Sequence, residues 1–257
     1  MPVSIPHHKI SYAQNFEDLV LAGLLKDVVN GFYVDVGANH DELDSVTKIF
    51  YDKGWTGINI EPNELLCEQL NKKRPHDINL QIGLGSVCGT SKFNQYESLD
   101  GLSTFSERRV SEVNATWPDA LVIQLPIEIS TLATVLNNHC LSIDIHFLKI
   151  DVEGLELEVV IGSDWKKWRP WVLCIERSQV TTQIDELAKR QTHARTSALE
   201  RFLNCVKYEK VFFDGINDFY LAEEKLSLWE KFDYGSDVIL NGVPVNYIFI
   251  NHINKSI

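Results

Sequence analysis

Acidic side chains stand at the ends of several short apolar stretches of the chain. The stretches FYVDVG, TGINIEP, HFLKIDVEG and WVLCIERS run into polar or small residues, namely Asp35, Gly37, Asn39, Glu61, Asp151, Glu153 and Glu176. Ligands of an open parallel sheet bind beyond the carboxyl ends of its strands. Carboxylates gathered there disfavour a polyphosphate and suit a ligand with an ammonium group, a sulfonium group and ribose hydroxyls. S-adenosylmethionine carries all of these groups.

The turn after the first stretch contains a single glycine, Gly37. The dinucleotide fingerprint G-x-G-x-x-G needs further glycines to bring the backbone against a pyrophosphate, so this turn favours another cofactor. Asp35 and the backbone amides of the turn suit the methionine end of S-adenosylmethionine. Glu61 ends the next strand, where a carboxylate can accept bonds from both ribose hydroxyls. Nicotinamide enzymes also use an acid there, so Glu61 alone does not separate the two cofactors.

Apolar runs alternate with amphipathic segments along most of the chain, which predicts an α/β fold with a mostly parallel, Rossmann-like sheet and helices on both faces. KVFFDGINDFYLAEE predicts an antiparallel hairpin near the C-terminal end of that sheet. We expect a single domain over residues 1–257. Its expected parts are an N-terminal helix within 11–30, a core over 31–223, an inserted lid at about 88–124 and an extension over 234–257. Helices are expected at 12–26, 45–53, 63–73, 132–138, 155–168 and 198–206.

The composition restricts the partners. The formal net charge is −12, and no basic run offsets it, so neither nucleic acid nor an anionic membrane surface is expected as a partner. The chain shows no signal-peptide pattern and no apolar run long enough for membrane insertion, which favours a cytoplasmic protein. The 5 cysteines are scattered without a C-x-x-C pair, which indicates neither a zinc site nor a disulfide framework.

Several motifs in a fixed order resemble those of the FkbM-type methyltransferases. They are SYAQNFEDLVL, VDVGAN, INIEP, FLKIDVEGLE, WRPWVLCIE and VFFDGINDFYL, which cover residues 11–223. The resemblance implies a class I fold, S-adenosylmethionine as donor, and O-methylation of hydroxyls on sugars or natural products, including bacterial surface glycans. The chain differs from many members at His40 and Asp41, where they continue with a second glycine.

We assign candidate roles to the residues around these motifs. Asp151, His40 and Lys149 are the expected catalytic residues, since a carboxylate or an imidazole can take the proton of the acceptor hydroxyl. The expected substrate-binding residues in the lid are Ser103, Thr104 and Trp117. The expected cofactor-binding residues are Asp35, Gly37, Asn39, Glu61, Gln14 and Ser45.

Some alternatives stay open. Lys149 lies among apolar residues and needs a partner such as Glu153 or Glu176, so a structural ion pair competes with a catalytic role. Asp151 and Glu176 can hold a Mg or Mn ion in place of direct base catalysis, because hard cations prefer oxygen ligands. The alternative functions are a nicotinamide-dependent sugar oxidoreductase and a non-catalytic module that binds a nucleoside or a sugar. A sugar or glycoconjugate is the expected partner, and a homo-oligomer is compatible with the sequence.

Overall fold

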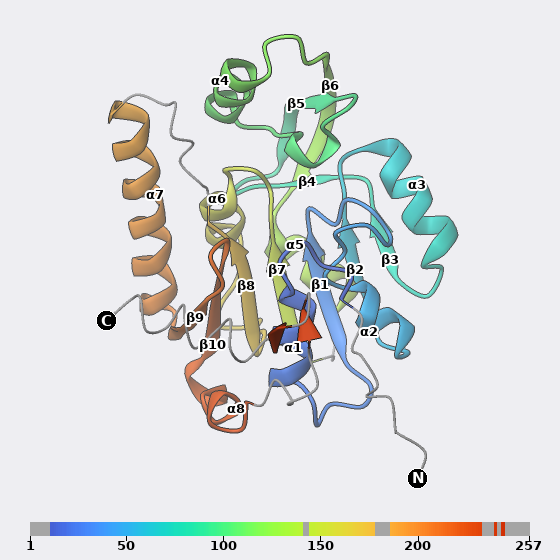
Figure 1. Cartoon of the computed structure of the whole chain (residues 1–257), viewed down its shortest axis with the longest axis vertical. Helices are drawn as coiled ribbons and strands as arrows, with labels where there is room; N and C mark the ends of the chain where they lie inside the picture. Colours follow the sequence, from blue (N-terminus) through green and yellow to red (C-terminus); the bar gives the residue numbers. More distant parts are fainter. Residues whose placement is uncertain (1–10, 141–143, 178–185, 233–238, 241–242, 245–257) are drawn as a thin grey trace.

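A seven-stranded sheet forms the centre of the protein, as a computed structural model shows (Figure 1). The structure describes residues 11–140, 144–177, 186–232, 239–240 and 243–244. The strand order is β3-β2-β1-β7-β8-β10-β9, and only β10 runs antiparallel to its neighbours. The strands are β1 (Phe32–Val36), β2 (Thr56–Ile60), β3 (Ile78–Leu80), β7 (Phe147–Ile150), β8 (Val172–Glu176), β9 (Tyr208–Phe213) and β10 (Asn217–Ala222). The expected parallel sheet and its antiparallel hairpin, β9–β10, are both confirmed.

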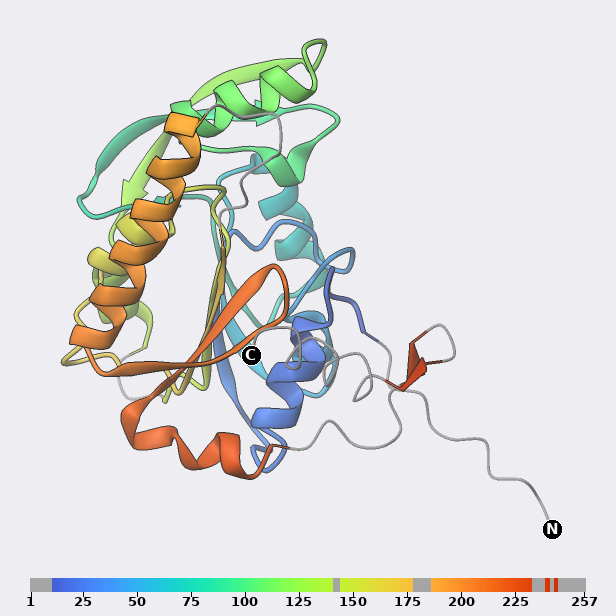
Figure 2. The same ribbon diagram turned by 60° about the vertical axis from the view of Figure 1, so that its left-hand side comes forward.

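Helices cover both faces of this sheet (Figure 2). One face packs against α5 (Leu132–His139), α6 (Glu156–Ile161) and α7 (Glu186–Cys205). The other packs against α1 (Glu17–Leu24), α2 (Lys48–Asp52) and α8 (Ser227–Glu230). All residues of β1 and β7 are therefore buried, which explains why these strands read as continuous apolar runs in the sequence.

Three helices are shorter than the sequence predicts, and one is longer. The helix expected over 12–26 is α1, which spans only Glu17–Leu24, and the helix expected over 198–206 is the end of α7, which begins at Glu186. The helix expected over 155–168 ends at Ile161, and its C-cap Gly162 donates its backbone N–H to the carbonyl of Glu158. A Cβ atom on Gly162 would lie 2.3 Å from the carbonyl oxygen of Gly85, so this turn has room only for glycine. The helix expected over 45–53 begins only at Lys48. By contrast, α3 (Glu64–Lys73) begins as expected, and its N-cap Asn63 accepts a bond from the N–H of Leu65.

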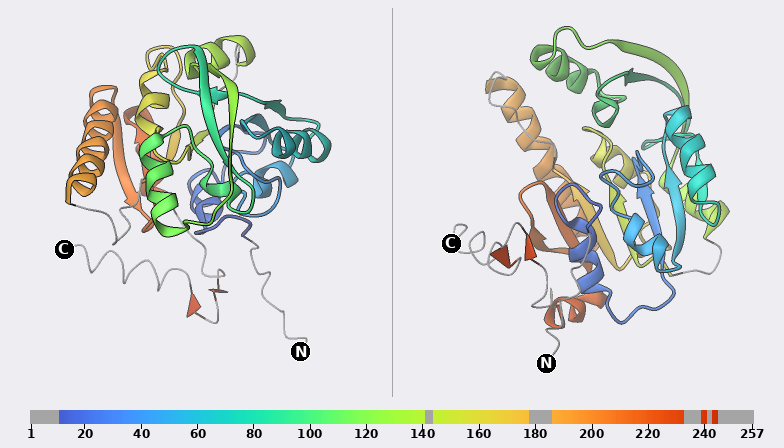
Figure 3. Two further views of the ribbon diagram at one scale, coloured as in Figure 1. Left: turned by 90° about the horizontal axis from the view of Figure 1, so that it is seen from above. Right: turned by 45° about the vertical axis from the view of Figure 1, so that its right-hand side comes forward.

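The segment expected to be an irregular lid over 88–124 has its own secondary structure. It contains one strand, and the start of another, of a second, three-stranded sheet, together with the 3₁₀ turn η1 (Asp100–Leu102) and the helix α4 (Glu107–Thr116). This sheet consists of β4 (Gly83–Leu84), β5 (Gly89–Tyr96) and β6 (Val122–Ser130). We call residues 89–130 the lid, and it lies over the carboxyl ends of the central strands (Figures 1 and 3). The sequence hides β6 because residues 122–126 are exposed on both faces of the strand.

Most of the expected extension over 234–257 lies outside the described residues, apart from β11 (Ile239–Leu240) and β12 (Val243–Pro244). Within the described part of the chain, no helix combines the length and the apolar character that crossing a bilayer requires.

Candidate active site

Two connected cavities lie between the lid and the carboxyl ends of the central strands. We call the first the apolar cavity; it has a volume of about 620 Å³ including its mouth, and Glu61 and Gly37 stand among apolar residues that include Ile60, Ile82, Leu84, Phe93 and Phe105. We call the second the acid cavity, since its lining includes Glu17, Asp151, Glu153 and Glu176. The two cavities share Asn39, Asp100, Gly101, Asp151 and Glu153. An apolar ligand part and a charged or reacting part could therefore occupy adjoining spaces.

The loop after β1, residues 37–39, forms one wall between the cavities. Gly37 has a φ of 80°, and a Cβ atom there would lie 1.7 Å from the carbonyl oxygen of Asp151. Only glycine therefore fits here, where the chain leaves the parallel neighbours β1 and β7. Asn39 also has a positive φ, 51°, and its Oδ1 atom is buried without a hydrogen-bond partner among the described residues. A buried acceptor in this state is suited to a donor group of a ligand.

Glu61 holds this loop from the end of β2. One carboxylate oxygen accepts a hydrogen bond from the N–H of Asn39 at 2.8 Å, and the other accepts one from the N–H of Asn63 at 2.8 Å. The side chain is 5% exposed, and burial raises the pKa of Glu61 to about 7. Each carboxylate oxygen can accept more than one bond, so Glu61 can still accept bonds from hydroxyls in the apolar cavity.

Lys149 links the loop to the neighbouring strand. Its Nζ atom donates to the carbonyl of Gly37 at 2.7 Å and lies 3.4 Å from carboxylate oxygens of Asp35 and Asp151. Burial alone would lower the pKa of Lys149, but the charges of Asp35 and Asp151 outweigh it and raise the pKa above its ordinary value. The expected partners Glu153 and Glu176 were therefore wrong, because β1 and β7 are direct neighbours in parallel register.

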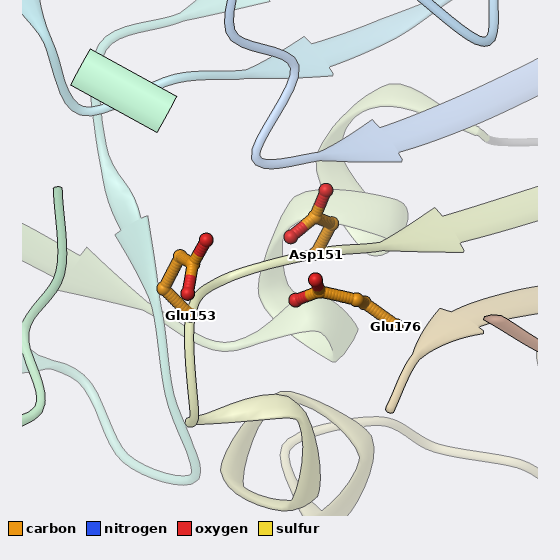
Figure 4. Close-up of side chains that lie close together, drawn as sticks. All are labelled: Asp151, Glu153 and Glu176. Atoms are coloured by element: carbon orange, nitrogen blue, oxygen red, sulfur yellow. The ribbon is translucent and has the colours of Figure 1, made fainter. Parts of the chain in front are cut away.

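Asp151, Glu153 and Glu176 form a cluster at the ends of β7 and β8, and their side chains point toward one another (Figure 4). One carboxylate oxygen from each lies within 4.8 Å of the others. Burial, and next the charge of Asp151, raises the pKa of Glu176 well above its ordinary value. Burial also raises the pKa of Glu153, against the opposing effect of Arg109. The cluster can hold a proton or a cation, and we call it the carboxylate triad.

Residues of the lid attach directly to the triad. Arg109 of α4 donates from Nε to the Glu153 carboxylate at 2.7 Å, and Thr104 donates from its hydroxyl to the Glu153 carbonyl at 2.9 Å. Glu153 itself has a φ of 55°, a conformation that such contacts must maintain. Thr104 is thus buried in a structural contact, whereas Ser103 lines the apolar cavity and accepts a bond from the N–H of Tyr96.

The other expected residues divide into two groups. Gln14 and Lys149 line the acid cavity, while Gly37, Asn39 and Glu61 line the apolar one. Ser45 is buried and accepts a bond from Arg74 at 2.6 Å, and Asp35 is buried and accepts one from Thr47 at 3.1 Å. Neither appears among the described residues that line the two cavities.

His40 and Trp117 lie apart from the cavities. The Nδ1 atom of His40 accepts bonds from the N–H groups of Glu42 and Leu43, and its Nε2 lies 3.0 Å from the Gln69 amide on α3. Trp117 is 45% exposed at the end of α4. Among the described residues that line either cavity, neither side chain is present. The structure does not bring these two residues to the site.

Sequence reasoning left Glu17 between a ligand contact and a helix cap, and it assigned no role to Asn217, Arg108 or Arg109, which also line the acid cavity. Glu17 of α1 is buried there, accepts a bond from the side-chain amide of Asn217 at 2.8 Å, and has a pKa that burial raises to about 7. The two residues are 200 positions apart, so no local pattern joins them. Arg108 and Arg109 also line this cavity, from a helix that the sequence did not predict. Their only sequence signal is the capping pattern Ser106-x-x-Arg109, in which Ser106 accepts from the N–H of Arg109.

The comparisons with known proteins agree with this geometry. The sequence model of the family described as "Methyltransferase FkbM domain" matches residues 35–209. That range begins at the end of β1 and includes the loop 37–39, the lid and the carboxylate triad. The comparison with curated proteins found no match. Because the match covers more than half of the chain, the protein is a methyltransferase that belongs to the FkbM family.

Proposed function

We propose that the protein transfers the methyl group of S-adenosylmethionine to a hydroxyl of a sugar or glycoconjugate. We further propose that it acts in the cytoplasm as one catalytic domain, in the synthesis of a bacterial surface polysaccharide. One observation carries the proposal: the apolar cavity, which contains Glu61, adjoins the acid cavity, and Asp151 lines both. A donor with an adenosyl part suits the first cavity, and a hydroxylated acceptor suits the second.

The residues of the apolar cavity fit the donor. Glu61 offers carboxylate oxygens to ribose hydroxyls, and the buried Oδ1 of Asn39 offers an acceptor to an ammonium group. The missing Cβ of Gly37 lets the backbone approach closely. When bound, S-adenosylmethionine supplies a methyl group made electrophilic by its sulfonium. The donor requires no compensating basic residue beyond Lys149, since its sulfonium and ammonium groups are positive.

The residues of the acid cavity supply the proton acceptor. The acceptor oxygen forms its bond to the methyl carbon as the carbon–sulfur bond breaks, and its hydroxyl proton must leave. Asp151 lines both cavities and is therefore placed to accept that proton. Lys149 lies 3.4 Å from the Asp151 carboxylate and orients it. Lys149 acts as a positioning residue, while Glu17 and Asn217 present polar atoms to sugar hydroxyls.

A second arrangement uses the carboxylate triad to hold a divalent cation. Asp151 and Glu176, with Glu153, offer the oxygen ligands that Mg²⁺ and Mn²⁺ prefer. Such an ion would lower the pKa of the acceptor hydroxyl. Exhaustive treatment with EDTA distinguishes the two arrangements: retained activity excludes the metal, and activity restored by Mg²⁺ or Mn²⁺ supports it.

The test of the proposal is a pair of titrations followed by an acceptor screen. We expect S-adenosylhomocysteine to raise the melting temperature, with a stabilisation of about 2.7 kcal/mol at a hundredfold excess over its dissociation constant. NAD and NADP should produce no shift, and stabilisation by NAD alone would support a sugar oxidoreductase instead. Release of S-adenosylhomocysteine is then measured with a panel of sugars. Donor binding without turnover on any sugar or glycan would favour the non-catalytic binding module.

A further inference from the structure

A third opening adjoins the acid cavity, between the start of α4, the loop at Gly154 and α7. Its lining consists of Ser106, Arg108, Gly154, Leu155, Ala194 and Arg195, and it shares Arg108 and Gly154 with the acid cavity. Of the described residues that line it, both charged ones are arginines. This is notable in a chain with 36 acidic and 24 basic residues. We call this opening the arginine pocket.

The two guanidinium groups converge on Gly154. Arg195 donates from Nη2 to the carbonyl of Gly154 at 3.2 Å. A Cβ atom on Gly154 would lie 3.2 Å from Nη2 of Arg108 and 3.6 Å from the hydroxyl oxygen of Ser106. Gly154 has a φ of 105° and therefore leaves open the space that a side chain would fill. Arg108 and the Ser106 hydroxyl thus lie beside the space that a side chain of residue 154 would fill, while Arg195 binds the carbonyl of the same glycine and lines the same pocket.

Both arginines are held in place by carboxylates of their own helices or neighbours. Arg108 pairs with Glu112 one turn along α4, and Arg195 pairs with Glu158 of α6. A guanidinium group has several N–H donors in a fixed planar arrangement, so a carboxylate partner orients the whole group. This arrangement is typical of residues that bind an oxyanion, because the cost of ordering the side chains has already been met by folding.

We propose that the arginine pocket binds an oxyanion of the acceptor, either a phosphate or a carboxylate. This inference rests on the proposed function and narrows the acceptor to sugars with an acidic substituent. Arginine binds both groups through paired N–H···O bonds, and the Ser106 hydroxyl adds a further donor. The pocket opens into the acid cavity at Gly154, next in sequence to Glu153 of the triad. An acceptor anchored there would extend its sugar ring toward Asp151. Among the described residues, neither arginine lines the apolar cavity proposed for the donor, so the donor's own carboxylate is the less suitable ligand.

Calorimetric titration of the full chain, saturated with S-adenosylhomocysteine, tests this site. The probes are glucose, glucuronate and glucose 6-phosphate, and inorganic phosphate and acetate represent the charged group alone. We expect at least one acidic sugar to bind at least tenfold more tightly than glucose. Preference for glucose 6-phosphate and phosphate identifies the phosphate as the ligand group, and preference for glucuronate and acetate identifies the carboxylate. Equal affinity for charged and neutral sugars, or no binding of any charged probe, would overturn the proposal.

Matched variants locate the binding. Arg108→Gln with Arg195→Gln should lower the affinity for the acidic sugar at least tenfold, to the level of glucose. Arg201→Gln, an exposed residue on the same helix as Arg195, should leave it unchanged. An unchanged affinity in the double variant would overturn the site. The site would also be overturned if the double variant bound S-adenosylhomocysteine more weakly but bound 5′-methylthioadenosine as well as wild type does. Because 5′-methylthioadenosine lacks the amino acid, that result would show that the arginines hold the amino-acid part of the donor. Wild-type protein that fails to bind S-adenosylhomocysteine refutes the proposed function itself, and that result is read before any sugar is added.

Discussion

The ammonium group of Lys149 on β7 donates a hydrogen bond to the carbonyl oxygen of Gly37, at 2.7 Å, where the chain leaves β1. The same ammonium group lies 3.4 Å from a carboxylate oxygen of Asp35 and 3.4 Å from one of Asp151. One buried cation therefore neutralises the Asp35 carboxylate, holds the loop 37–39 and positions Asp151, the proposed base. The site depends on this contact before any ligand binds.

Replacement of Lys149 tests that dependence. Lys149→Met leaves Asp35 buried without its cation, and we expect a loss of about 3–5 kcal/mol in the free energy of unfolding, measured with urea. Adding Asp35→Asn should recover part of the stability. S-adenosylhomocysteine affinity should stay low in both variants, because the bond to Gly37 is absent. Lys207→Met, which removes an exposed lysine, should change stability by less than about 0.5 kcal/mol. A Lys149→Met protein as stable as wild type would show that the buried ion pair contributes nothing.

Glu61 should determine donor affinity. Glu61→Ala removes the proposed acceptor of the ribose hydroxyls and the support of Asn39, and we expect S-adenosylhomocysteine to bind more weakly by about 1–3 kcal/mol in calorimetry. Because the pKa of Glu61 is raised to about 7, wild-type affinity should also increase as the pH rises through 7 and the carboxylate forms. The variant should lose this pH dependence. Glu68→Ala, an exposed position on α3, is the control, and equal effects in both variants would remove Glu61 from the donor site.

Glu17 should make stability depend on pH. Burial raises the pKa of Glu17 from 4.5 to about 7, so the folded protein binds this proton more tightly than the unfolded chain. The resulting stabilisation is complete below pH 4.5 and is lost as the pH rises through 7. Relative to Glu17→Gln, wild-type protein should therefore become less stable between pH 5 and 8, as followed by urea unfolding. As a control, the difference in stability between wild type and Glu209→Gln, an exposed position, should not change with pH. A pH-independent difference between wild type and Glu17→Gln would contradict the raised pKa of Glu17.

Asp151 and His40 should differ sharply in turnover. Asp151→Asn should reduce methyl transfer at least about a hundredfold, a loss of roughly 2.7 kcal/mol in transition-state stabilisation, whether Asp151 acts as the base or as a metal ligand. His40→Ala should retain most of the activity, because the imidazole caps its own loop and contacts Gln69 outside the cavities. Both rates are measured as release of S-adenosylhomocysteine with an acceptor from the screen. A larger loss of turnover in His40→Ala than in Asp151→Asn would instead identify His40 as the acceptor of the hydroxyl proton.

The central sheet could be predicted because each strand carries its own signal. Buried strands such as β1 and β7 read as apolar runs that end in an acid, and the α3 boundary is set by a local cap at Asn63. The lid was expected as an insertion, but its strands and helix could not be predicted, because β6 is stabilised by pairing with β5 and not by burial of its own side chains. Long-range partners were also hidden: the contact between Glu17 and Asn217 exists only once α1 lies beside β10. The contact of Asp35 with Lys149 was hidden for the same reason, since Lys149 reaches it from another strand.

The close approach of Gly37 to Asp151 also bears on how the specificity of this enzyme can evolve. The loop 37–39 and Asp151, the proposed base, meet at one backbone contact, where a Cβ atom on Gly37 would lie 1.7 Å from the Asp151 carbonyl oxygen. Their relative position is therefore fixed by adjacent strands of a rigid sheet and needs no adjustment when ligands bind. The lid, by contrast, meets this unit through a few side chains such as Thr104 and Arg109. Residues 89–130 can thus change in length and sequence, and so admit new acceptors, while the distance over which the methyl group travels stays the same.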